Sequence, residues 1–296
     1  MREWIITQNC TLKEFTDTHD PQASFFFSAL MKSRDIKVNG VRADSPDMPL
    51  FSGDRVRYYL TEKQQEKPAF YVAYEDDCLL VADKESGVNS EAVFAMLSRA
   101  YSSNGEPSKN KGENAQNNVY FIHRLDRNTR GLLLFAKTEK AAEAVKKSFK
   151  ERAINKTYLA VCADRFIANA AVEEAYLIKD KERSLVRVSN KKEQGAEKII
   201  TQYEVLEKKG ELALCKITLH TGKTHQIRAH MAHIHCPVLG DTKYGDKALN
   251  ERYKKTRQCL LAKSLTLHFP PSSPLGYADG ETFVSRFNLS LSAKDD

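Results

Sequence analysis

Phe121-Ile-His-Arg-Leu-Asp-Arg-Asn-Thr-Arg-Gly-Leu-Leu-Leu-Phe-Ala-Lys137 stands near the middle of the chain and holds an apolar run on each side of a polar loop. This pattern predicts two strands joined through the loop. The loop carries one acid, Asp126, with Arg124 and Arg127 close on either side. Because an acid in a polar loop is usually a turn residue, the loop alone does not identify a catalytic carboxylate.

The composition indicates a basic protein of 296 residues with a substantial core. Lys and Arg number 46 against 39 Asp and Glu, the formal net charge is +7, and 41% of the residues are hydrophobic. A mild basic excess suggests a polyanionic partner such as RNA. A basic enzyme without a nucleic-acid substrate fits the charge about equally well.

The six cysteines are scattered and form no Cys-x-x-Cys pair. This usage is typical of a reduced, cytoplasmic protein. The first residues include acids and no apolar signal region. No apolar run approaches the roughly 20 residues that a membrane helix requires, so we expect a soluble protein without a membrane partner.

Residues 1–62 are predicted to form a separate unit, followed by a polar linker over 63–69. A helix is expected to start at Thr11–Phe15, and another is expected over Pro21–Lys32, where Phe26 and Leu30 share one face. A strand over residues 36–38 then leads into an Asn-Gly hairpin turn, and a closing strand is expected over residues 56–60.

Ser33–Gly40 and Gly53–Val56 resemble the alpha-L RNA-binding module. Residues 1–60 hold eight basic and eight acidic residues, so RNA binding here would require the basic side chains to gather on one face. The candidates are Lys32, Arg34, Lys37 and Arg42. A packing or scaffold role for this unit is the alternative.

Residues 70–296 are predicted to form the larger domain. A helix capped by Thr138 is expected to run to about residue 152. Most other segments read as short strands, the last of them over residues 283–289. We therefore expect an α+β fold with a large mixed, mainly antiparallel sheet and a small N-terminal α/β module. Residues 102–118 have almost no apolar content and are predicted to form a mobile surface loop, either a lid or an insertion.

Three ordered segments of this domain resemble the motifs of RluA-type RNA pseudouridine synthases. The loop around Asp126 is similar to the family pattern His-Arg-Leu-Asp-x-x-Thr-Ser-Gly, with Arg130 in place of serine. Asn155–Ala160 looks like the strand that carries the active-site tyrosine, here Tyr158. Thr221–His230 resembles Thr-Gly-Arg-Thr-His-Gln-Ile-Arg, with Lys223 for the first arginine and Arg228 at the active-site arginine.

Tyr74–Gly87 also resembles the opening strand motif of that family, which usually ends Lys-Pro-x-Gly. Lys84 and Gly87 fit this pattern, whereas Glu85 replaces the proline. The resemblance therefore covers most of residues 70–296.

The resemblance implies that the chain isomerises uridine to pseudouridine in RNA. Asp126 would be the catalytic carboxylate, and whether it attacks the sugar or removes a sugar proton stays open. Arg228 would hold Asp126 ionised by an ion pair. Tyr158 would lie against the uracil ring and is a candidate base, although a phenol with a pKa near 10 needs nearby cations or a relay. The reaction involves no redox change, so no cofactor is expected.

The target base must leave its helix to react, and basic side chains near Asp126 are predicted to hold the RNA. Arg124 would fill the vacated space or hold the flipped nucleotide, and Arg127 and Arg130 would bind flanking phosphates. We hypothesise that Arg130 alters substrate preference through its phosphate contact. The full set of RNA-binding candidates in this domain is His123, Arg124, Arg127, Arg130, Lys156, Lys223, Thr224, His225 and Gln226.

A second chemistry considered from the sequence is a metal site. Nitrogen and sulfur side chains suited to zinc crowd one segment, at His225, His230, His233, His235 and Cys236. Their spacing matches no zinc pattern, so no metal is predicted. A metal-dependent hydrolase is retained as an alternative that a chelator would test.

The resemblance thus implies an RNA pseudouridine synthase that acts on large-subunit ribosomal RNA first and transfer RNA second, and a monomer is the default expectation. A non-catalytic RNA-binding or ribosome-assembly protein with the same fold is the alternative.

Overall fold

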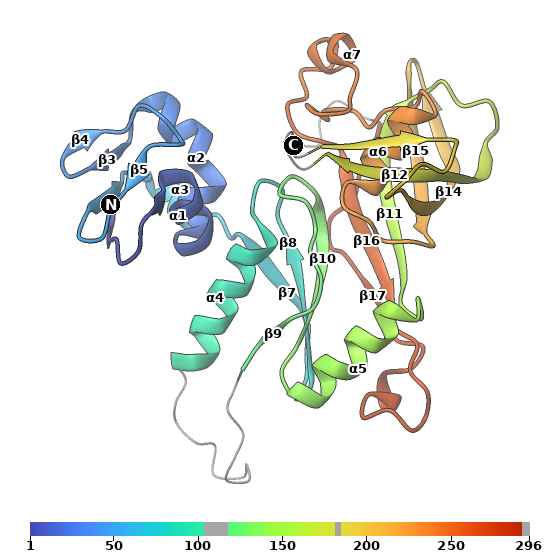
Figure 1. Cartoon of the computed structure of the whole chain (residues 1–296), viewed down its shortest axis with the longest axis horizontal. Coiled ribbons are helices and arrows are strands. Elements are labelled where there is room, and N and C mark those ends of the chain that lie inside the picture. The colour runs from blue at the N-terminus through green and yellow to red at the C-terminus, as the bar shows by residue number, and fades with distance from the viewer. Residues whose placement is uncertain (104–117, 181–184, 292–296) are drawn as a thin grey trace.

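Three β-sheets organise the chain in the computed structural model, which describes residues 1–103, 118–180 and 185–291 (Figure 1). A four-stranded sheet and a two-stranded sheet lie in the first 58 residues, and an 11-stranded sheet is built from residues 70–284. Helices pack against these sheets without alternating regularly with parallel strands. The predicted α+β class is therefore confirmed.

The N-terminal unit has the predicted order of two helices followed by a hairpin. The Thr11 side chain accepts from the Glu14 N–H and closes a capping box at the start of α1, and Asp20 caps α2. The turn after β3 places Asn39 at φ 51° and Gly40 at φ 85°, as a tight hairpin requires. The elements are β1 (Arg2–Ile5), β2 (Cys10–Thr11), α1 (Leu12–His19), α2 (Pro21–Ser33), β3 (Ile36–Val38), β4 (Val41–Arg42), β5 (Pro49–Leu50) and β6 (Arg55–Tyr58).

The segment predicted as a linker contains a short helix, α3 (Glu62–Glu66). Thr61 and Gln64 form a capping box at its start, which explains why this polar stretch is helical. The Gln22 amide of α2 donates to the carbonyl of Lys67 at 2.6 Å. The end of this segment is therefore attached to the N-terminal unit.

The large sheet runs in the order β13-β12-β14-β15-β11-β16-β10-β8-β7, with β17 beside β16 and β9 beside β10. Every pair in it is antiparallel except β10 with β16, so the sheet is mixed and mainly antiparallel as predicted. Gly131 has φ 113° where β10 meets β16, and a side chain there would collide with the carbonyl oxygen of Ala262. The strands are β7 (Phe70–Glu75), β8 (Leu79–Lys84), β9 (Tyr120–Phe121), β10 (Arg130–Ala136), β11 (Asn155–Ala163), β12 (Ala170–Asp180), β13 (Leu185–Ser189), β14 (Glu197–Lys209), β15 (Leu212–Leu219), β16 (Leu260–Thr266) and β17 (Thr282–Val284).

Helices cover both faces of β8 and β10, which explains why the run after Asp126 is continuously apolar. On one face, α4 (Ser90–Ser103) packs through Ala92, Val93 and Leu97. On the other, α5 (Glu139–Lys150) packs through Ala141, Ala142 and Val145. Two shorter helices, α6 (Gln226–His233) and α7 (Lys247–Arg252), precede β16.

Several elements differ from the sequence prediction. The strand expected over residues 283–289 covers only Thr282–Val284, because Ser285 and Arg286 turn to donate to the carboxylate of Asp83. Helix α4 and the strands β12 and β16 were not predicted. The predicted loop at 102–118 begins later, since α4 extends to Ser103, and residues 104–117 lie outside the described part of the chain. Within the described ranges, no helix is long and apolar enough to cross a membrane.

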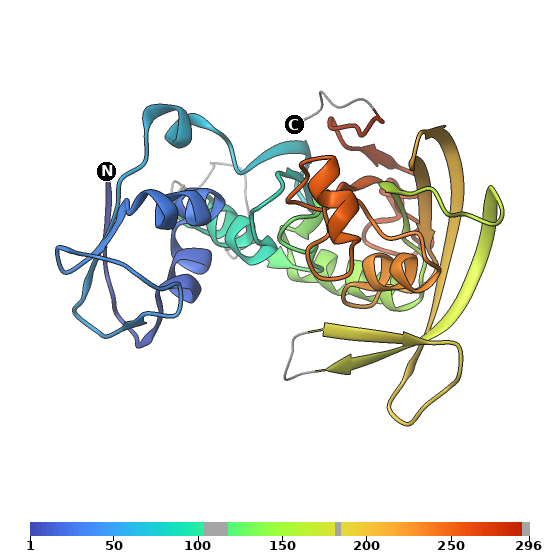
Figure 2. The same ribbon diagram turned by 90° about the horizontal axis from the view of Figure 1, so that it is seen from above.

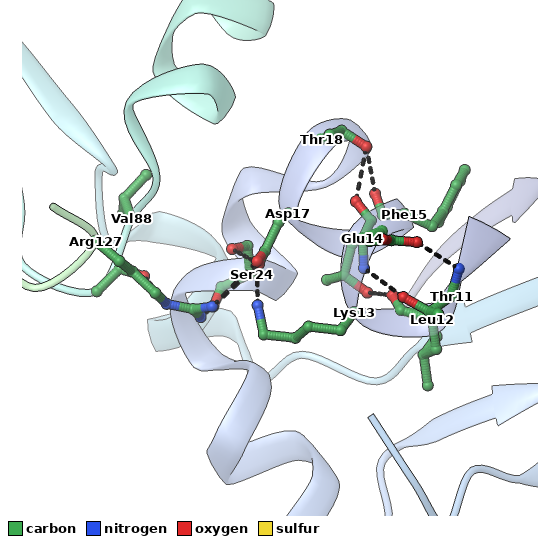
Figure 3. Close-up of polar contacts among 12 residues, drawn as sticks. Thr11, Leu12, Lys13, Glu14, Phe15, Asp17, Thr18, Ser24, Val88 and Arg127 are labelled. Carbon is green, nitrogen blue, oxygen red and sulfur yellow. Dashed lines mark hydrogen bonds and ion pairs between the residues drawn. The ribbon is translucent and has the colours of Figure 1, made fainter. Parts of the chain in front are cut away.

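The N-terminal unit lies at one end of the molecule, opposite the strands β12–β15, and it contacts the polar loop after Asp126 (Figure 2). The Arg127 guanidinium lies 3.2 Å from Oδ1 of Asp17 in α1 and donates to the carbonyl of Ser24 in α2 (Figure 3). Its Nε donates to the carbonyl of Gly87 at 3.0 Å. Arg127 therefore bridges the N-terminal unit and the larger domain.

Asp17→Asn is expected to loosen this docking, because the amide cannot pair with Arg127 as a charged acceptor. A partly buried ionic hydrogen bond contributes about 1–2 kcal/mol, so transient undocking should become about tenfold more frequent. Limited trypsin proteolysis at Lys63 and Lys67 would measure this. Cleavage no faster than in the surface control Asp44→Asn would show that Arg127 does not hold the unit.

Candidate active site

Asp126 lies in the loop between β9 and β10, and hydrogen bonds hold this loop on both sides of it. The Leu125 N–H donates to Oγ of Ser90 at 2.9 Å, and that hydroxyl donates back to the Leu125 carbonyl. The Thr129 N–H donates to the carbonyl of Asp126 at 3.0 Å. The backbone that carries Asp126 is therefore fixed without using its carboxylate.

Lys84 supports the same loop from the end of β8. Its ammonium is fully buried and donates to the carbonyls of Glu85, Val88 and Arg127 at 2.8–3.0 Å. Burial lowers the pKa of Lys84 to about 7, and the nearby Asp126 and Glu85 carboxylates oppose this shift. A lysine at this position therefore joins β8 to the Asp126 loop.

Arg228 places its cation directly on the Asp126 carboxylate. Its Nη1 donates to Oδ2 of Asp126 at 2.8 Å. Its Nε and Nη2 donate to the two oxygens of Asp241 at 2.7 and 2.9 Å. Arg228 is 6% exposed and Asp241 2%, so solvent screens this bidentate pair weakly.

Asp241 is a site residue to which the sequence analysis gave no role. Its Oδ1 also accepts the backbone N–H groups of Lys243 and Tyr244. Burial raises the pKa of Asp241, but the hydrogen bonds and charge of Arg228 outweigh that effect and leave the pKa below its ordinary value. The sequence alone does not reveal this role, because it depends on a contact with Arg228, 13 residues away, that only the folded structure shows.

His225 also approaches Asp126. It directly precedes α6 and adopts the left-handed conformation, at φ 56°, and its Nε2 lies 3.9 Å from Oδ1 of Asp126. Its Nδ1 lies 2.8 Å from the Tyr244 hydroxyl, which accepts the Val186 N–H of β13. Burial lowers the pKa of His225, so a neutral ring faces Asp126 at neutral pH.

Tyr158 reaches the same place from β11 and is 8% exposed. Burial raises its pKa well above the ordinary value, and the charge of Asp126 adds to the shift. A phenol held neutral in this way is a poor base near pH 7. The geometry therefore favours ring contact for Tyr158 and leaves proton transfer dependent on a relay.

Four of these residues, Asp126, Tyr158, His225 and Arg228, line one cavity of about 290 Å³. It is enclosed by elements distant in sequence, namely the Asp126 loop, α5, β11, β16 and the start of α6. A concave, partly apolar pocket with converging polar groups is the usual form of a site for one small group, such as a flipped base. Its lining comprises His123, Arg124, Leu125, Asp126, Thr129, Phe149, Lys156, Tyr158, Gly222, Lys223, Thr224, His225, Gln226, Ile227, Arg228 and Leu260.

Seven of the predicted RNA-binding residues line this cavity, but they differ in whether their side chains already have partners within the protein. Arg124 is exposed and pairs with Glu91 at 2.9 Å, so it can exchange that partner for RNA. Lys223 is paired with Glu197. The Gln226 side chain is 2% exposed and bonds Thr221 and Thr201, so it acts inside the protein.

His123 is likewise bound within the fold. Its Nε2 accepts the Leu134 N–H at 3.0 Å, and its ring packs on Phe149. Burial, with a smaller effect of Lys156, lowers the pKa of His123 to about 3. The ring therefore faces the cavity uncharged and cannot attract phosphate.

The remaining RNA-binding candidates lie outside the cavity. The Arg127 guanidinium, which was predicted to bind flanking phosphates, is engaged by Asp17 and the Ser24 carbonyl of the N-terminal unit. Arg130 pairs with Glu85 at 2.9 Å. Lys32, Arg34 and Lys37 lie in the N-terminal unit, where Lys37 of β3 is flanked in register by Arg42 and Arg57.

Three of the histidines that were considered as metal ligands form hydrogen bonds with different residues. His225 contacts Tyr244, His230 contacts Thr201 at 2.9 Å, and His233 contacts Asn190 at 2.6 Å. Among the described residues, no group of three or more His, Cys, Asp or Glu side chains is arranged to hold a metal ion.

His230 makes stability depend on pH. It is 2% exposed, and burial with the nearby His233 lowers its pKa from 6.5 to about 4. Below pH 6.5 the unfolded chain binds a proton that the folded chain does not, so stability falls with pH and about 2 kcal/mol is lost by pH 5. In His230→Gln, the drop in unfolding free energy between pH 7 and 5 should be smaller by that amount. Urea titrations would measure it, and a drop equal to that of the exposed control His268→Gln would contradict it.

Known proteins resemble this chain in sequence and in fold. Residues 78–233, more than half of the chain, match the family described as RNA pseudouridylate synthase. A ribosomal large subunit pseudouridine synthase C from Vibrio cholerae is 30% identical, with 74% of this chain and 71% of the relative covered. The protein of the same name from Haemophilus ducreyi is 29% identical, with 82% and 79% covered.

A ribosomal large subunit pseudouridine synthase D from Buchnera aphidicola is also 29% identical, with 82% of this chain and 80% of the relative covered. Among solved structures, Human RNA Pseudouridylate Synthase Domain Containing 4 matches with a TM-score of 0.58 and 22% identity, over 73% of this chain and 88% of that chain. That structural likeness shows a shared fold. The chain belongs to the RNA pseudouridylate synthase family, as the three sequence segments predicted.

Proposed function

We propose that this pseudouridine synthase isomerises uridines of large-subunit ribosomal RNA, with Asp126 as its catalytic carboxylate. The observation that supports this role is the 2.8 Å ion pair between Asp126 and Arg228 inside the cavity. A permanently charged guanidinium favours the ionised carboxylate and fixes its direction. The relatives named for large-subunit ribosomal RNA support the choice of substrate.

The reaction breaks the bond from ribose to the base nitrogen, turns the uracil and joins it to ribose through carbon five. Asp126 acts on the sugar, either by attack on its carbon or by removal of its proton. Tyr158 packs against the uracil ring. The proton displaced from carbon five leaves through a relay rather than directly to Tyr158, because the pKa of that phenol is raised. Atoms and electrons balance within the substrate, so the proposal includes no cofactor.

RNA would reach the cavity over a basic surface. A second hollow of about 740 Å³ adjoins the cavity and shares Phe149, Lys156, Gly222 and Lys223 with it. Lys150 and Arg152 extend the positive charge along this hollow. We assign it to nucleotides that flank the target, because cations along a groove follow a phosphate backbone.

We further propose that residues 1–62 form an RNA-binding module, joined through 63–69 to a catalytic domain over 70–296. Lys37 of β3 lies opposite Arg42 of β4, and this pair supports an anionic partner because like charges placed opposite each other destabilise a sheet. Arg57 of β6, on the other side of Lys37, is paired with Glu3 of β1. A monomer located in the cytoplasm completes the proposal. Transfer RNA is the second substrate to test.

The test is to incubate the purified protein with protein-free large-subunit ribosomal RNA or with transfer RNA and to map pseudouridine in both. Stoichiometric conversion of discrete uridines in the ribosomal RNA is expected. Conversion confined to transfer RNA would reject the proposed substrate while retaining the activity. The absence of conversion in either RNA, with tight binding to both, would favour a non-catalytic RNA-binding protein.

A further inference from the structure

The segment between β8 and α4, residues 85–89, is hydrogen-bonded to the chain directly after Asp126. The Gly87 N–H donates to the carbonyl of Arg127 at 2.9 Å, and Nε of Arg127 donates back to the Gly87 carbonyl at 3.0 Å. The buried Lys84 ammonium donates to the same Arg127 carbonyl. The residue that follows Asp126 is therefore held both by its backbone and by its side chain.

The far end of the Arg127 side chain is held by the N-terminal unit (Figure 3). Its Nη1 lies 3.2 and 3.3 Å from the two carboxylate oxygens of Asp17, and its Nη2 donates to the carbonyl of Ser24. The Ser24 hydroxyl donates to the same Asp17 carboxylate at 2.6 Å and orients it. Each nitrogen of the guanidinium thus donates within the protein, and two of the three bind the N-terminal unit.

An apolar contact joins the N-terminal unit to the residue that precedes Asp126. Phe25 of α2 is 4% exposed and lies in the same buried cluster as Val88 and Leu125. Undocking would expose this ring to water, so its burial stabilises the docked unit. The unit is therefore joined to both chain neighbours of Asp126, by an ionic contact at Arg127 and by an apolar cluster at Leu125.

The position of the reacting carboxylate depends on how firmly these neighbours are held. Arg228 binds one oxygen of Asp126 through one nitrogen, at 2.8 Å, which leaves the carboxylate free to turn about that bond. Displacement of a reacting group by about 1 Å can lower a rate by about 10²-fold. The backbone on either side of Asp126 must therefore supply the remaining constraint.

We propose that docking of the N-terminal unit through Arg127 positions Asp126 for reaction. The unit then sets the rate of the chemical step, in addition to any affinity that it has for RNA. Among the described residues that line the active cavity, Arg127 is absent, so it is a positioning residue that acts through its neighbour. This inference rests on the proposed role of Asp126.

The test uses Asp17→Lys, which places a cation against Arg127. At saturating ribosomal RNA, its single-turnover rate should fall at least about tenfold, whereas its RNA affinity should change less than about threefold. The control Asp44→Lys makes the same charge change at an exposed position of the same unit and should keep the wild-type rate. A unit that served only as an RNA tether would change the affinity and leave the saturating rate unchanged.

A charge exchange separates this coupling from two unrelated losses. Arg127→Glu should lower the saturating rate as Asp17→Lys does. The double variant Asp17→Lys/Arg127→Glu restores opposite charges, so its rate should exceed that of either single variant by at least about threefold. Residues that acted independently would give losses that multiply in the double variant.

Amide hydrogen exchange supplies a direct readout of the loop. In Asp17→Lys, exchange over residues 125–130 should become several times faster, whereas β14 should exchange as in wild type. Equal saturating rates in Asp17→Lys and Asp44→Lys, a faster rate in Asp17→Lys than in wild type, or a double variant slower than both single variants would overturn the inference. Failure of the wild-type protein to convert any uridine would instead reject the proposed function, so the two failures are distinguishable.

Discussion

Asp126→Asn is expected to reduce the single-turnover rate of pseudouridine formation by at least about 10³-fold, which corresponds to about 4 kcal/mol of lost transition-state stabilisation. Asparagine has nearly the same shape, and its oxygen can still accept from Arg228. The substitution therefore removes the negative charge and the nucleophilic or basic oxygen without emptying the cavity. Arg228 stays anchored by its bidentate bonds to Asp241.

Because the cavity and Arg228 keep their shape in this variant, RNA affinity should change less than about threefold. That is well below the tenfold change that corresponds to about 1.4 kcal/mol. Rapid-quench assays on ribosomal RNA would give the rate, and filter binding would give the affinity. The control is Asp77→Asn, which makes the same chemical change at an exposed turn. A variant that retains more than a tenth of the wild-type rate would remove Asp126 from the chemistry.

Asp241→Asn is expected to affect both stability and rate. The substitution leaves the buried guanidinium of Arg228 with Asp126 as its remaining anionic partner, and Asp126 is more exposed. Removing one partner of a buried ion pair costs about 3–5 kcal/mol, so the unfolding free energy should fall by about that amount. Because Arg228 loses its anchor, kcat should also fall, by about 10²-fold or more.

The pH dependence of the Asp241 contribution has a defined sign. Its folded pKa lies below the ordinary value, so its stabilisation is fully present above about pH 4 and is lost as pH falls through the folded pKa. The difference between wild type and Asp241→Asn should therefore be the same at pH 7 and pH 5 in urea titrations. The control is Glu251→Gln on the exposed face of α7. An unfolding free energy within 1 kcal/mol of this control would show that Asp241 does not stabilise Arg228.

The local parts of the fold could be predicted from the sequence because local signals specify them. Thr11, Thr138 and Asn39-Gly40 identify two helix starts and a hairpin, and all three appear in the structure. The parallel pairing of β10 with β16 had no such signal, because it joins residues about 130 positions apart through a glycine contact. The sequence of β16 contains no feature that predicts which strands it pairs with in the sheet.

The active cavity shows the same division. Asp126, Tyr158 and Arg228 came from motif resemblance, and the structure places all three around one cavity. The residues that support them are distant in sequence and meet them only in the folded chain, so composition and spacing do not predict those contacts. Arg127 meets an acid 110 positions earlier in the chain, so its use in docking could not be read from a polar loop. The role of Asp241 could not be predicted for the same reason, because it depends on how the loop before α7 folds back onto Arg228.

The most direct test of the central claim is pseudouridine mapping of ribosomal RNA from cells that lack this gene and are complemented with wild type or Asp126→Asn. The account predicts that discrete pseudouridines vanish from large-subunit RNA in the deletion, return with wild type and stay absent with the variant at equal protein abundance. Return of those pseudouridines with Asp126→Asn would contradict the claim that this carboxylate performs the reaction.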